Sequence, residues 1–493
     1  MKNSLKKYPF FLFLLPLFLI IHIWKEFHPL IKFEVVYSEI LILLILPFAL
    51  LLIFYIGTKS IQKAALLSFI LCLAFYFIGE IKDWLMQVIN SEFLRSYTFL
   101  LPLSLILIII CAALILKNRS GFGRSFLFLN TLFLLIVAVD LSLLIYKIAI
   151  GNRSFPFAIA KDYQPCNNCE KPDIFFLVFD SYTSTGLLKE ELNYDNSSLD
   201  SALKQRGFQI IYGSRSNYNL TPFSIGSSFN MDYLENVDTS KIYRLRNYLP
   251  AVKKVYDNAL IQILEKEGYE IRNHSLFDMR NSPTSIPGFD IWGTKQLFEQ
   301  HNLYKKLSKD IGWQFPGWLR TGPSNKLKTY AINRDTHDST TINNILKSAA
   351  EKNEKPVFVY GHLFLPHSPY TYDSTGKKIE PVWMLNPVAD KNAYVEQIIY
   401  TKKIMLQLID SILANRKRPL ALIIQGDHGY RFFDQTKNEK EFPNLNAVYF
   451  SSGKYAGLGD SNTNVQTFRF LLNNWFGKQY PYLEDHFYFL HYK

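Results

Sequence analysis

The sequence contains little cysteine, with only four in 493 residues. Cys72 and Cys111 lie inside long apolar runs, where a thiol behaves as a small apolar side chain. Cys166 and Cys169 form a single C-x-x-C, and no second pair exists to complete a structural zinc site. We therefore expect a local disulfide between them, which is stable in an oxidising compartment.

Nucleotide-binding and nucleic-acid-binding signals are missing as well. The sequence has no Walker loop, no G-x-G-x-x-G, no internal repeat and no low-complexity tract. Its formal charge of +12 comes from Lys and Arg scattered along the chain rather than gathered into a basic stripe with interleaved aromatics. This argues against a nucleic-acid partner, whereas membrane proteins carry such an excess for topology and contact with anionic head groups.

Composition changes sharply near residue 150, and we predict a transmembrane domain (1–150), a linker (151–171) and an extracytoplasmic catalytic domain (172–493). The last region, about 340 residues, is long enough to bury a large core. Before residue 150, Leu, Ile and Phe dominate, and five runs approach the length that a bilayer requires. The first follows a basic N-terminus as a signal peptide does, but without a small-residue cleavage site, so we expect an uncleaved span. The predicted spans are Pro9–Trp24, Glu39–Ile56, Ala64–Ile78, Thr98–Leu116 and Phe126–Tyr146.

Basic residues fix the orientation of these spans. With a cytoplasmic N-terminus, eight Lys and Arg fall in inside segments and four in outside loops, as the positive-inside rule requires. An odd number of spans then places the chain after residue 150 outside, as expected of a multi-pass protein of the bacterial cytoplasmic (inner) membrane. Asp140 lies within the fifth span, where a carboxylate is a functional candidate or is solvated near the outer end.

The outer domain alternates apolar runs with helical patterns. The runs 173–180, 356–362, 420–428 and 446–450 are typical of buried strands, and 393–414 and 462–475 of amphipathic helices. This alternation predicts an α/β domain with a mainly parallel central sheet covered by helices. We expect Asp278–Asn325, rich in Gly, Pro and Trp, to form an irregular excursion over the sheet.

Three predicted strands end in metal-ligand residues, namely Asp180, His362 and the pair Asp427-His428. Sites in such folds form beyond the carboxyl ends of strands, so a metal centre is expected there. The glycines flanking Asp427-His428 would let the backbone bend tightly around an ion. Alternatively, Asp180 caps a helix starting near Ser181.

Two further segments offer reactive side chains. His362 and His367 bracket a proline-containing loop, and either imidazole could steady anionic oxygens or protonate a leaving group. Thr221 and Ser224 lie at a predicted helix start, where the positive end of the helix dipole favours phosphate or sulfate. Thr221 before Pro222 also fits an ordinary N-cap followed by proline at the first helical position.

The order of these residues resembles the sulfatase-like branch of the alkaline-phosphatase superfamily. With five N-terminal spans, the chain is similar to lipoteichoic-acid synthases and lipid A phosphoethanolamine transferases. The resemblance implies one divalent metal ion (Mn, Mg or Zn). It implies that Asp180, Thr221, Asp427 and His428 hold this ion, that Thr221 is the nucleophile, and that His367 and His362 contact substrate.

Two departures from the family bear on the activity. Asp180 matches sulfatases, whereas the transferases commonly carry Glu, yet the C/S-x-P-x-R motif that sulfatases convert to formylglycine is absent. The resemblance therefore implies a transferase moving a phosphoryl-linked head group, of phosphoethanolamine or phosphoglycerol type, from a membrane lipid to an envelope glycan or lipid. The alternatives are a phosphate or sulfate ester hydrolase of the same superfamily and a catalytically silent membrane scaffold.

Overall fold

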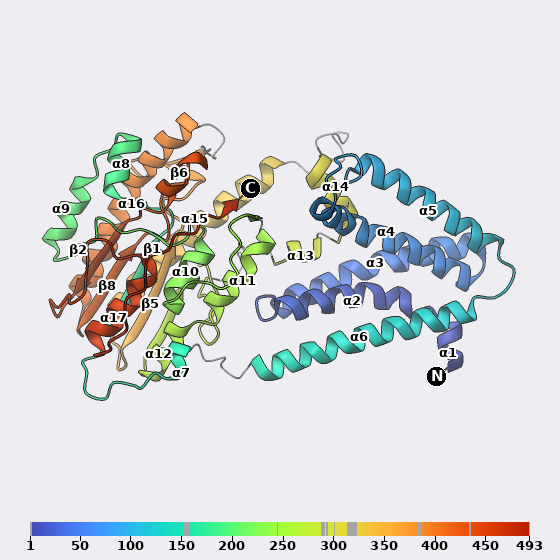
Figure 1. Cartoon of the computed structure of the whole chain (residues 1–493), viewed down its shortest axis with the longest axis horizontal. Helices are drawn as coiled ribbons and strands as arrows, with labels where there is room; N and C mark the ends of the chain where they lie inside the picture. Colours follow the sequence, from blue (N-terminus) through green and yellow to red (C-terminus); the bar gives the residue numbers. More distant parts are fainter. Residues whose placement is uncertain are drawn as a thin grey trace. The chain divides into compact units, whose positions relative to one another are not determined.

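The structure is a computed structural model that describes residues 2–151, 158–243, 245–286, 291, 294–299, 301–312, 323–382, 387–432 and 435–492. It divides into two compact units (Figure 1). The first comprises Met1–Ser154 and Gly293–Gly322, and the second Phe155–Trp292 and Pro323–Lys493.

The first unit contains five helices long and apolar enough to cross a membrane, which confirms the predicted number of spans. They are α2 (Phe10–Phe27), α3 (Phe33–Thr58), α4 (Ile61–Val88), α5 (Tyr97–Lys117) and α6 (Gly123–Gly151), preceded by the short α1 (Lys2–Lys7). Helix α2 packs against α3 and α6, and α4 packs against α3 and α5. Many large apolar side chains of α3, α5 and α6 are exposed, as expected of surfaces that face lipid.

Polar side chains inside this bundle are paired. Asp140 on α6 is buried and accepts a hydrogen bond from Lys25 Nζ on α2, and His22 Nδ1 lies 2.9 Å from its other oxygen. Asn130 donates to the backbone oxygens of Leu5 and Tyr8. These contacts give Asp140 a structural role, which is how intramembrane carboxylates are commonly stabilised.

The segment Gly293–Gly322 belongs to the membrane unit, so the predicted excursion over the sheet is wrong for its described residues. Its helices α13 (Gln296–Glu299) and α14 (Leu303–Ile311) pack against α2 and α4, respectively. Asp310 accepts hydrogen bonds from Lys82 Nζ (3.0 Å) and Tyr97 OH (2.8 Å), and Lys306 pairs with Asp83. The same contacts explain why α4 is longer than the predicted span, since its polar last turns bind α14.

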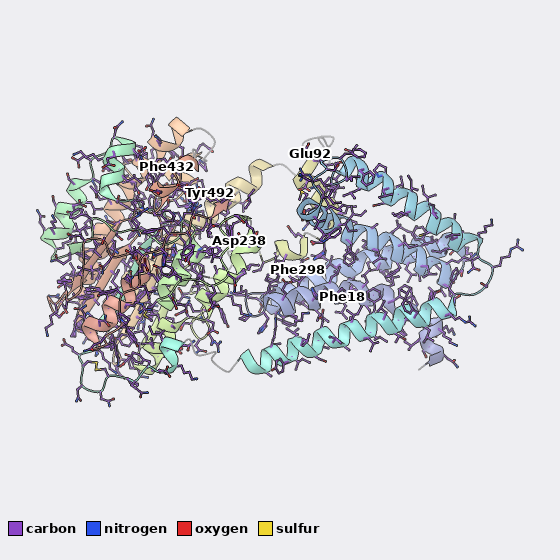
Figure 2. The ribbon with its side chains drawn as sticks, viewed as in Figure 1. Phe18, Glu92, Asp238, Phe298, Phe432 and Tyr492 are labelled. Atoms are coloured by element: carbon purple, nitrogen blue, oxygen red, sulfur yellow. A yellow bond between two sulfur atoms is a disulfide. The ribbon has the colours of Figure 1, made fainter. Side chains whose placement is uncertain are left out.

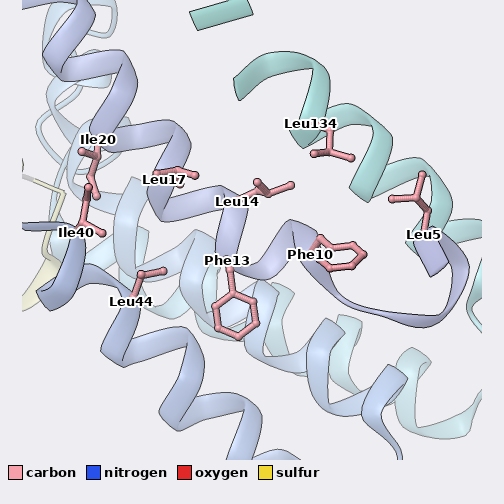
Figure 3. Close-up of a pocket in the computed structure, with 9 residues that line it drawn as sticks. All are labelled: Leu5, Phe10, Phe13, Leu14, Leu17, Ile20, Ile40, Leu44 and Leu134. Atoms are coloured by element: carbon pink, nitrogen blue, oxygen red, sulfur yellow. The ribbon is translucent and has the colours of Figure 1, made fainter. Parts of the chain in front are cut away.

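An apolar cavity of about 400 Å³ lies among the spans (Figure 3). Its walls come from α1, α2, α3 and α6, and all nine lining side chains are apolar. In a bilayer such a cavity is filled by hydrocarbon. The lining residues are Leu5, Phe10, Phe13, Leu14, Leu17, Ile20, Ile40, Leu44 and Leu134.

The second unit is built on a six-stranded sheet in the order β2-β9-β8-β1-β5-β4. Strands β8 (Leu420–Gln425), β1 (Asp173–Phe179), β5 (Val357–Leu363) and β4 (Glu270–His274) are parallel. At one edge, β9 (Asn446–Phe450) runs antiparallel to β8, and β2 (Gln209–Ile210) antiparallel to β9. The mainly parallel sheet is confirmed. β1, β5 and β9 lie within one residue of the predicted runs, and β8 ends at Gln425, three residues before the end of its predicted run at His428.

Helices cover both faces of this sheet (Figure 1). Phe175, Leu177 and Phe179 point to a core formed with α8 (Thr185–Leu192), α9 (Ser197–Gln205), α15 (Pro323–Ala350) and α16 (Pro387–Asn415). Phe176 points the other way, against Phe229 of α10 (Thr221–Asn230) and Phe468 of α17 (Thr467–Trp475). Helices α11 (Leu245–Tyr256) and α12 (Ala259–Lys266) pack beside α10.

The segment that precedes β1 is held against the end of α12 by hydrogen bonds and an ion pair. Cys166 and Cys169 are disulfide-bonded, as predicted. Buried Glu267 accepts hydrogen bonds from Tyr163 OH (2.6 Å) and the Cys166 backbone N–H (2.8 Å), and pairs with Lys171 Nζ. The residues just before the first strand are therefore fixed to the second unit.

Candidate active site

The carboxyl ends of three adjacent strands bring Asp180, His362 and Asp427 together. Strand β1 lies between β5 and β8, and Val178 is paired with His362 on one side and Gln425 on the other. Because side chains alternate with a period of two, His362, Asp180 and Asp427 fall on the face that carries Phe176 and α10. Sequence reasoning therefore found the right strand ends, and register places all three on one face.

Three buried polar atoms in this group have no hydrogen-bond partner among the described residues. They are Asp180 Oδ1, Asp427 Oδ2 and His362 Nε2. The three residues each offer a ligand atom within 4.8 Å of the others, and Asp180, His367 and His428 form a second such group. Buried polar atoms are almost always satisfied, and two carboxylates with imidazoles suit a divalent cation. This donor set therefore fits the metal that the resemblance implies.

His428 is fully buried and presents its Nε2 to the same centre. Its Nδ1 lies 2.8 Å from the Gly429 backbone oxygen, so Nδ1 carries the proton and Nε2 the lone pair. Nε2 is 3.6 Å from Asp180 Oδ1 and 3.5 Å from Asp427 Oδ2. Burial lowers the pKa of His428 to about 4. The ring is neutral at physiological pH, which is the form that binds metals.

The two carboxylates have opposite pKa shifts. Burial raises the pKa of Asp180 well above its ordinary value, and the nearby Asp427 raises it further. Burial also acts to raise the pKa of Asp427, but His428, His362 and the Ser181 backbone N–H outweigh it and the net pKa is lowered. That N–H donates to Asp427 Oδ1 at 2.9 Å, from a residue held at φ 65°. A cation would relieve the repulsion between the two acids.

Thr221 is the first residue of α10, and Leu220 is its N-cap. The prediction that Thr221 is the cap is therefore wrong by one residue, and its hydroxyl makes no capping bond. Instead Thr221 Oγ1 lies 3.4 Å from His428 Nε2. Ser224 is fully buried and its Oγ donates to the Asp427 backbone oxygen at 2.5 Å. Of the two hydroxyls, only that of Thr221 opens onto the carboxylate–imidazole group.

Asp180 does not cap a helix either. Helix α8 begins at Thr185, and the Ser184 side chain accepts from the Leu187 backbone N–H in the usual capping manner. Oδ1 of Asp180 therefore remains buried and accepts no hydrogen bond from a helix N-terminus that the structure describes.

The loop after β5 places His367 at the outer side of the group. Asp338 on α15 accepts hydrogen bonds from the backbone N–H groups of Phe364 (2.7 Å) and Leu365 (3.2 Å). One turn away, Arg334 donates to backbone oxygens of the loop and stacks 4.1 Å from the Phe364 ring. Burial and the two nearby guanidinium groups hold the pKa of His367 well below its ordinary value. His367 is therefore neutral in this arrangement.

His362 is completely buried, unlike His367. Its Nδ1 lies 2.8 Å from Tyr360 OH, so its Nε2 faces the two carboxylates. Burial lowers its pKa to about 3. This position favours metal coordination over the substrate contact that was predicted.

Gly426 and Gly429 are required by close packing, not by an unusual backbone turn. Neither has a positive φ. A Cβ on Gly426 would lie 2.4 Å from the Tyr182 backbone oxygen, and one on Gly429 would lie 2.5 Å from that of Pro443. The glycines let neighbouring backbone approach the motif closely and so fix Asp427 and His428 in position.

Sequence reasoning missed several residues at this site. Arg431 Nη2 lies 3.0 Å from His428 Nε2, and its place three residues after His428 was a usable signal. Asn219 exchanges hydrogen bonds with the Leu490 backbone and donates to Glu441, which joins the C-terminal segment to the helix start. No motif indicates Asn219, Glu441 or Arg334, because their partners are distant in sequence.

The fold and the site together define an α/β protein with a candidate metal centre beside a helix-borne hydroxyl, an arrangement suited to ester and phosphoryl transfer. A family model named Sulfatase matches residues 215–471, which is just over half of the chain. The chain therefore belongs to the sulfatase family. This membership confirms the resemblance, the α/β fold and the assignment as a sulfatase-like enzyme.

No curated protein sequence matches the chain. Many solved structures are similar, and three of them illustrate the range. The membrane protein lipooligosaccharide phosphoethanolamine transferase A (EptA) of Neisseria meningitidis is 13% identical, with 93% of this chain and 94% of that one covered and a TM-score of 0.37. The periplasmic domain of phosphoethanolamine transferase EptC from Campylobacter jejuni is 13% identical (62% and 91% covered, TM-score 0.35). The putative sulfatase yidJ of Bacteroides fragilis is 12% identical (63% and 75% covered, TM-score 0.39). All three TM-scores lie below 0.5, so the assignment rests on the family match.

Proposed function

We propose that the protein transfers a phosphoryl-linked head group from a membrane lipid to an envelope glycan or lipid, through a covalent intermediate on Thr221. The head group is of the phosphoethanolamine or phosphoglycerol type. The catalytic unit faces the outside of the bacterial cytoplasmic membrane, to which the five spans anchor it. The predicted transmembrane domain (1–150), linker (151–171) and catalytic domain (172–493, apart from Gly293–Gly322, which belongs with the spans) would then keep the site near its lipid donor.

One observation carries this proposal. The Thr221 hydroxyl faces a buried group of carboxylates and imidazoles, 3.4 Å from His428 Nε2, whereas the hydroxyl of the rival Ser224 donates to the Asp427 backbone oxygen. A threonine hydroxyl is too weakly acidic to attack at neutral pH without activation. The Thr221 hydroxyl contacts His428 Nε2, which belongs to the candidate metal group, and this points to metal activation.

One divalent ion would be held by Asp180, Asp427, His428 and the Thr221 hydroxyl, and His362 would be a further ligand. When bound, such an ion supplies Lewis-acid chemistry, which stabilises an alkoxide and the charge on phosphoryl oxygens. Mn²⁺, Mg²⁺ and Zn²⁺ all suit mixed oxygen and nitrogen ligands. The hydrogen bond from His428 Nδ1 to the Gly429 oxygen orients the ring for this role.

In the first step, Thr221 Oγ attacks the donor phosphorus. An Oγ–P bond forms, the bond from phosphorus to the diacylglycerol oxygen breaks, and diacylglycerol leaves with one proton while the threonine loses one. In the second step, an acceptor hydroxyl attacks the same phosphorus, a bond from the acceptor oxygen to phosphorus forms and the Oγ–P bond breaks. The acceptor loses one proton and Thr221 Oγ gains one, directly or through solvent, which restores the threonine. This order predicts ping-pong kinetics.

His367 serves this reaction as a neutral imidazole. Its Nδ1 lies 2.5 Å from the Ser368 oxygen, and Arg334 and Asp338 hold its loop. We propose that its Nε2 accepts a hydrogen bond from a hydroxyl or amine of the substrate, because its Nδ1–H is donated to the Ser368 oxygen and its lowered pKa disfavours the protonated form that a general acid requires.

Product analysis tests the transferase. Full-length protein is incubated with vesicles of phosphatidylethanolamine or phosphatidylglycerol, with and without an added sugar-lipid acceptor. The proposal predicts diacylglycerol in amounts matching the modified acceptor. Release of the free phosphate ester without acceptor would instead identify a hydrolase, and no turnover with any ester would favour a scaffold. Thr221→Ala is the matched negative control.

A further inference from the structure

Arg431 is a half-buried cation near the proposed centre, and none of the carboxylates that the structure describes is paired with it. Its guanidinium forms no ion pair within 4.0 Å with any acid that the structure describes, and its Nε is buried without a hydrogen-bond partner there. The ring of the C-terminal Tyr492, labelled in Figure 2, lies 5.0 Å from the guanidinium carbon. An arginine remains charged when buried, so such a group is costly unless an anion binds it.

The donors of Arg431 point at two imidazole nitrogens. Nη1 lies 3.2 Å from His367 Nε2, and Nη2 lies 3.0 Å from His428 Nε2. An imidazole nitrogen has a single lone pair, and His428 Nε2 is also the atom that faces Asp180 and Asp427. Coordination of a divalent ion by this nitrogen would take that lone pair. Nη2 also donates to the Asn219 backbone oxygen at 3.3 Å, so the Nη2 hydrogen that faces His428 would then need a different acceptor.

Arg334 shows the contrast. It is buried near His367, and its Nη1 lies 3.4 Å from His367 Nδ1, but its donors also reach the backbone oxygens of Phe364, His367 and Ser368. Arg334 is thus satisfied and holds the loop in place. Arg431 instead has weakly committed donors beside Thr221, since both Arg431 and the Thr221 hydroxyl contact His428 Nε2.

We propose that Arg431 binds a non-bridging phosphoryl oxygen of the substrate, and that metal binding at His428 releases Arg431 for this contact. This rests on the proposed function and extends it to a specific anion-binding residue. Because the ion and the guanidinium would otherwise repel each other, an oxyanion that touches both is stabilised by both. Metal and phosphate therefore bind cooperatively.

The experiment measures binding of inorganic phosphate to the full-length protein in detergent by calorimetry, with and without Mn²⁺ or Zn²⁺. We expect the metal to strengthen phosphate binding by about tenfold or more, as a charge-assisted hydrogen bond requires. Arg431→Gln should lose that gain while it still binds one metal ion, and Arg431→Lys should keep part of it.

Arg215→Gln is the matched control. Arg215 packs 4.1 Å from the Phe487 ring, much as Arg431 packs near Tyr492, but it contacts neither His367 nor His428 in the described structure. The Arg215→Gln protein should bind phosphate with the same affinity as the wild type. The inference about Arg431, but not the proposed function, would be overturned by either of two results. One is equal phosphate affinity of the metal-loaded wild type and Arg431→Gln, and the other is equal phosphate affinity of the wild type with and without metal. Failure of the wild type to bind any divalent metal would overturn the proposed function as well, so the two failures are distinct.

Discussion

Replacement of Asp427 by Asn should abolish metal-dependent stabilisation without weakening the metal-free protein. Asn keeps an oxygen for the Ser181 backbone N–H, which donates to Asp427 Oδ1 at 2.9 Å, and so preserves the local geometry. It removes a negative charge that faces Asp180 and an unsatisfied ligand atom. The metal-free variant should therefore melt at or above the wild-type temperature, because two buried carboxylates no longer repel each other.

The size of the metal-dependent stabilisation follows from the preferential binding of the ion to the folded state. An ion present at 100 times its Kd adds about 2.7 kcal/mol to the free energy of unfolding of the state that binds it. For a domain of about 320 residues, whose unfolding entropy is about 2.1 cal/mol/K per residue, this is a rise in Tm of about 4 °C, which differential scanning calorimetry in chelator and in Mn²⁺ or Zn²⁺ resolves. Asp200→Asn is the control, because Asp200 binds Thr185 instead and should leave the shift intact. A full metal-dependent shift in Asp427→Asn would refute the reasoning.

Three further predictions concern other parts of the account. Thr221→Ala should lose turnover with unchanged Tm. Ser224→Ala should keep turnover but lose about 1 kcal/mol of stability, because it loses a buried hydrogen bond. The reverse pattern of turnover would assign the nucleophile to Ser224. In chelator, stability should fall as pH rises through the raised pKa of Asp180, since the protonated acid is favoured in the folded state; Asp180→Asn should flatten that profile. Alkaline-phosphatase fusions after Lys171 should be active, and activity of a reporter that works only in the cytoplasm would contradict the topology.

Much of the fold was predictable because it depends on local pattern. The five apolar runs, the buried strands and the helix 393–414 follow from composition and periodicity, and the structure contains them as α2 to α6, β1, β5, β8, β9 and α16. The parallel arrangement followed from alternation of strands and helices. Register then explains why carboxylates on separate strands share one face.

Features that depend on distant partners were not predictable. The segment Gly293–Gly322 belongs with the spans through Asp310 and Lys306, which bind Lys82, Tyr97 and Asp83 more than 200 residues away. Nothing in the sequence distinguishes Arg431 from an ordinary surface arginine, because its partial burial depends on loops that meet only in the folded chain. Thr221 was displaced from the cap position because Leu220, not Thr221, adopts the extended conformation before α10.

The central claim is that Thr221 carries the transferred group, and peptide mass spectrometry tests it most directly. The full-length protein is exposed to vesicles of phosphatidylethanolamine or phosphatidylglycerol without acceptor, quenched in acid and digested. The account predicts a phosphoethanolamine or phosphoglycerol adduct on Thr221, which requires divalent metal and disappears when acceptor is added. An adduct on Ser224, or an unmodified Thr221 in a protein that turns over both lipids, would contradict it.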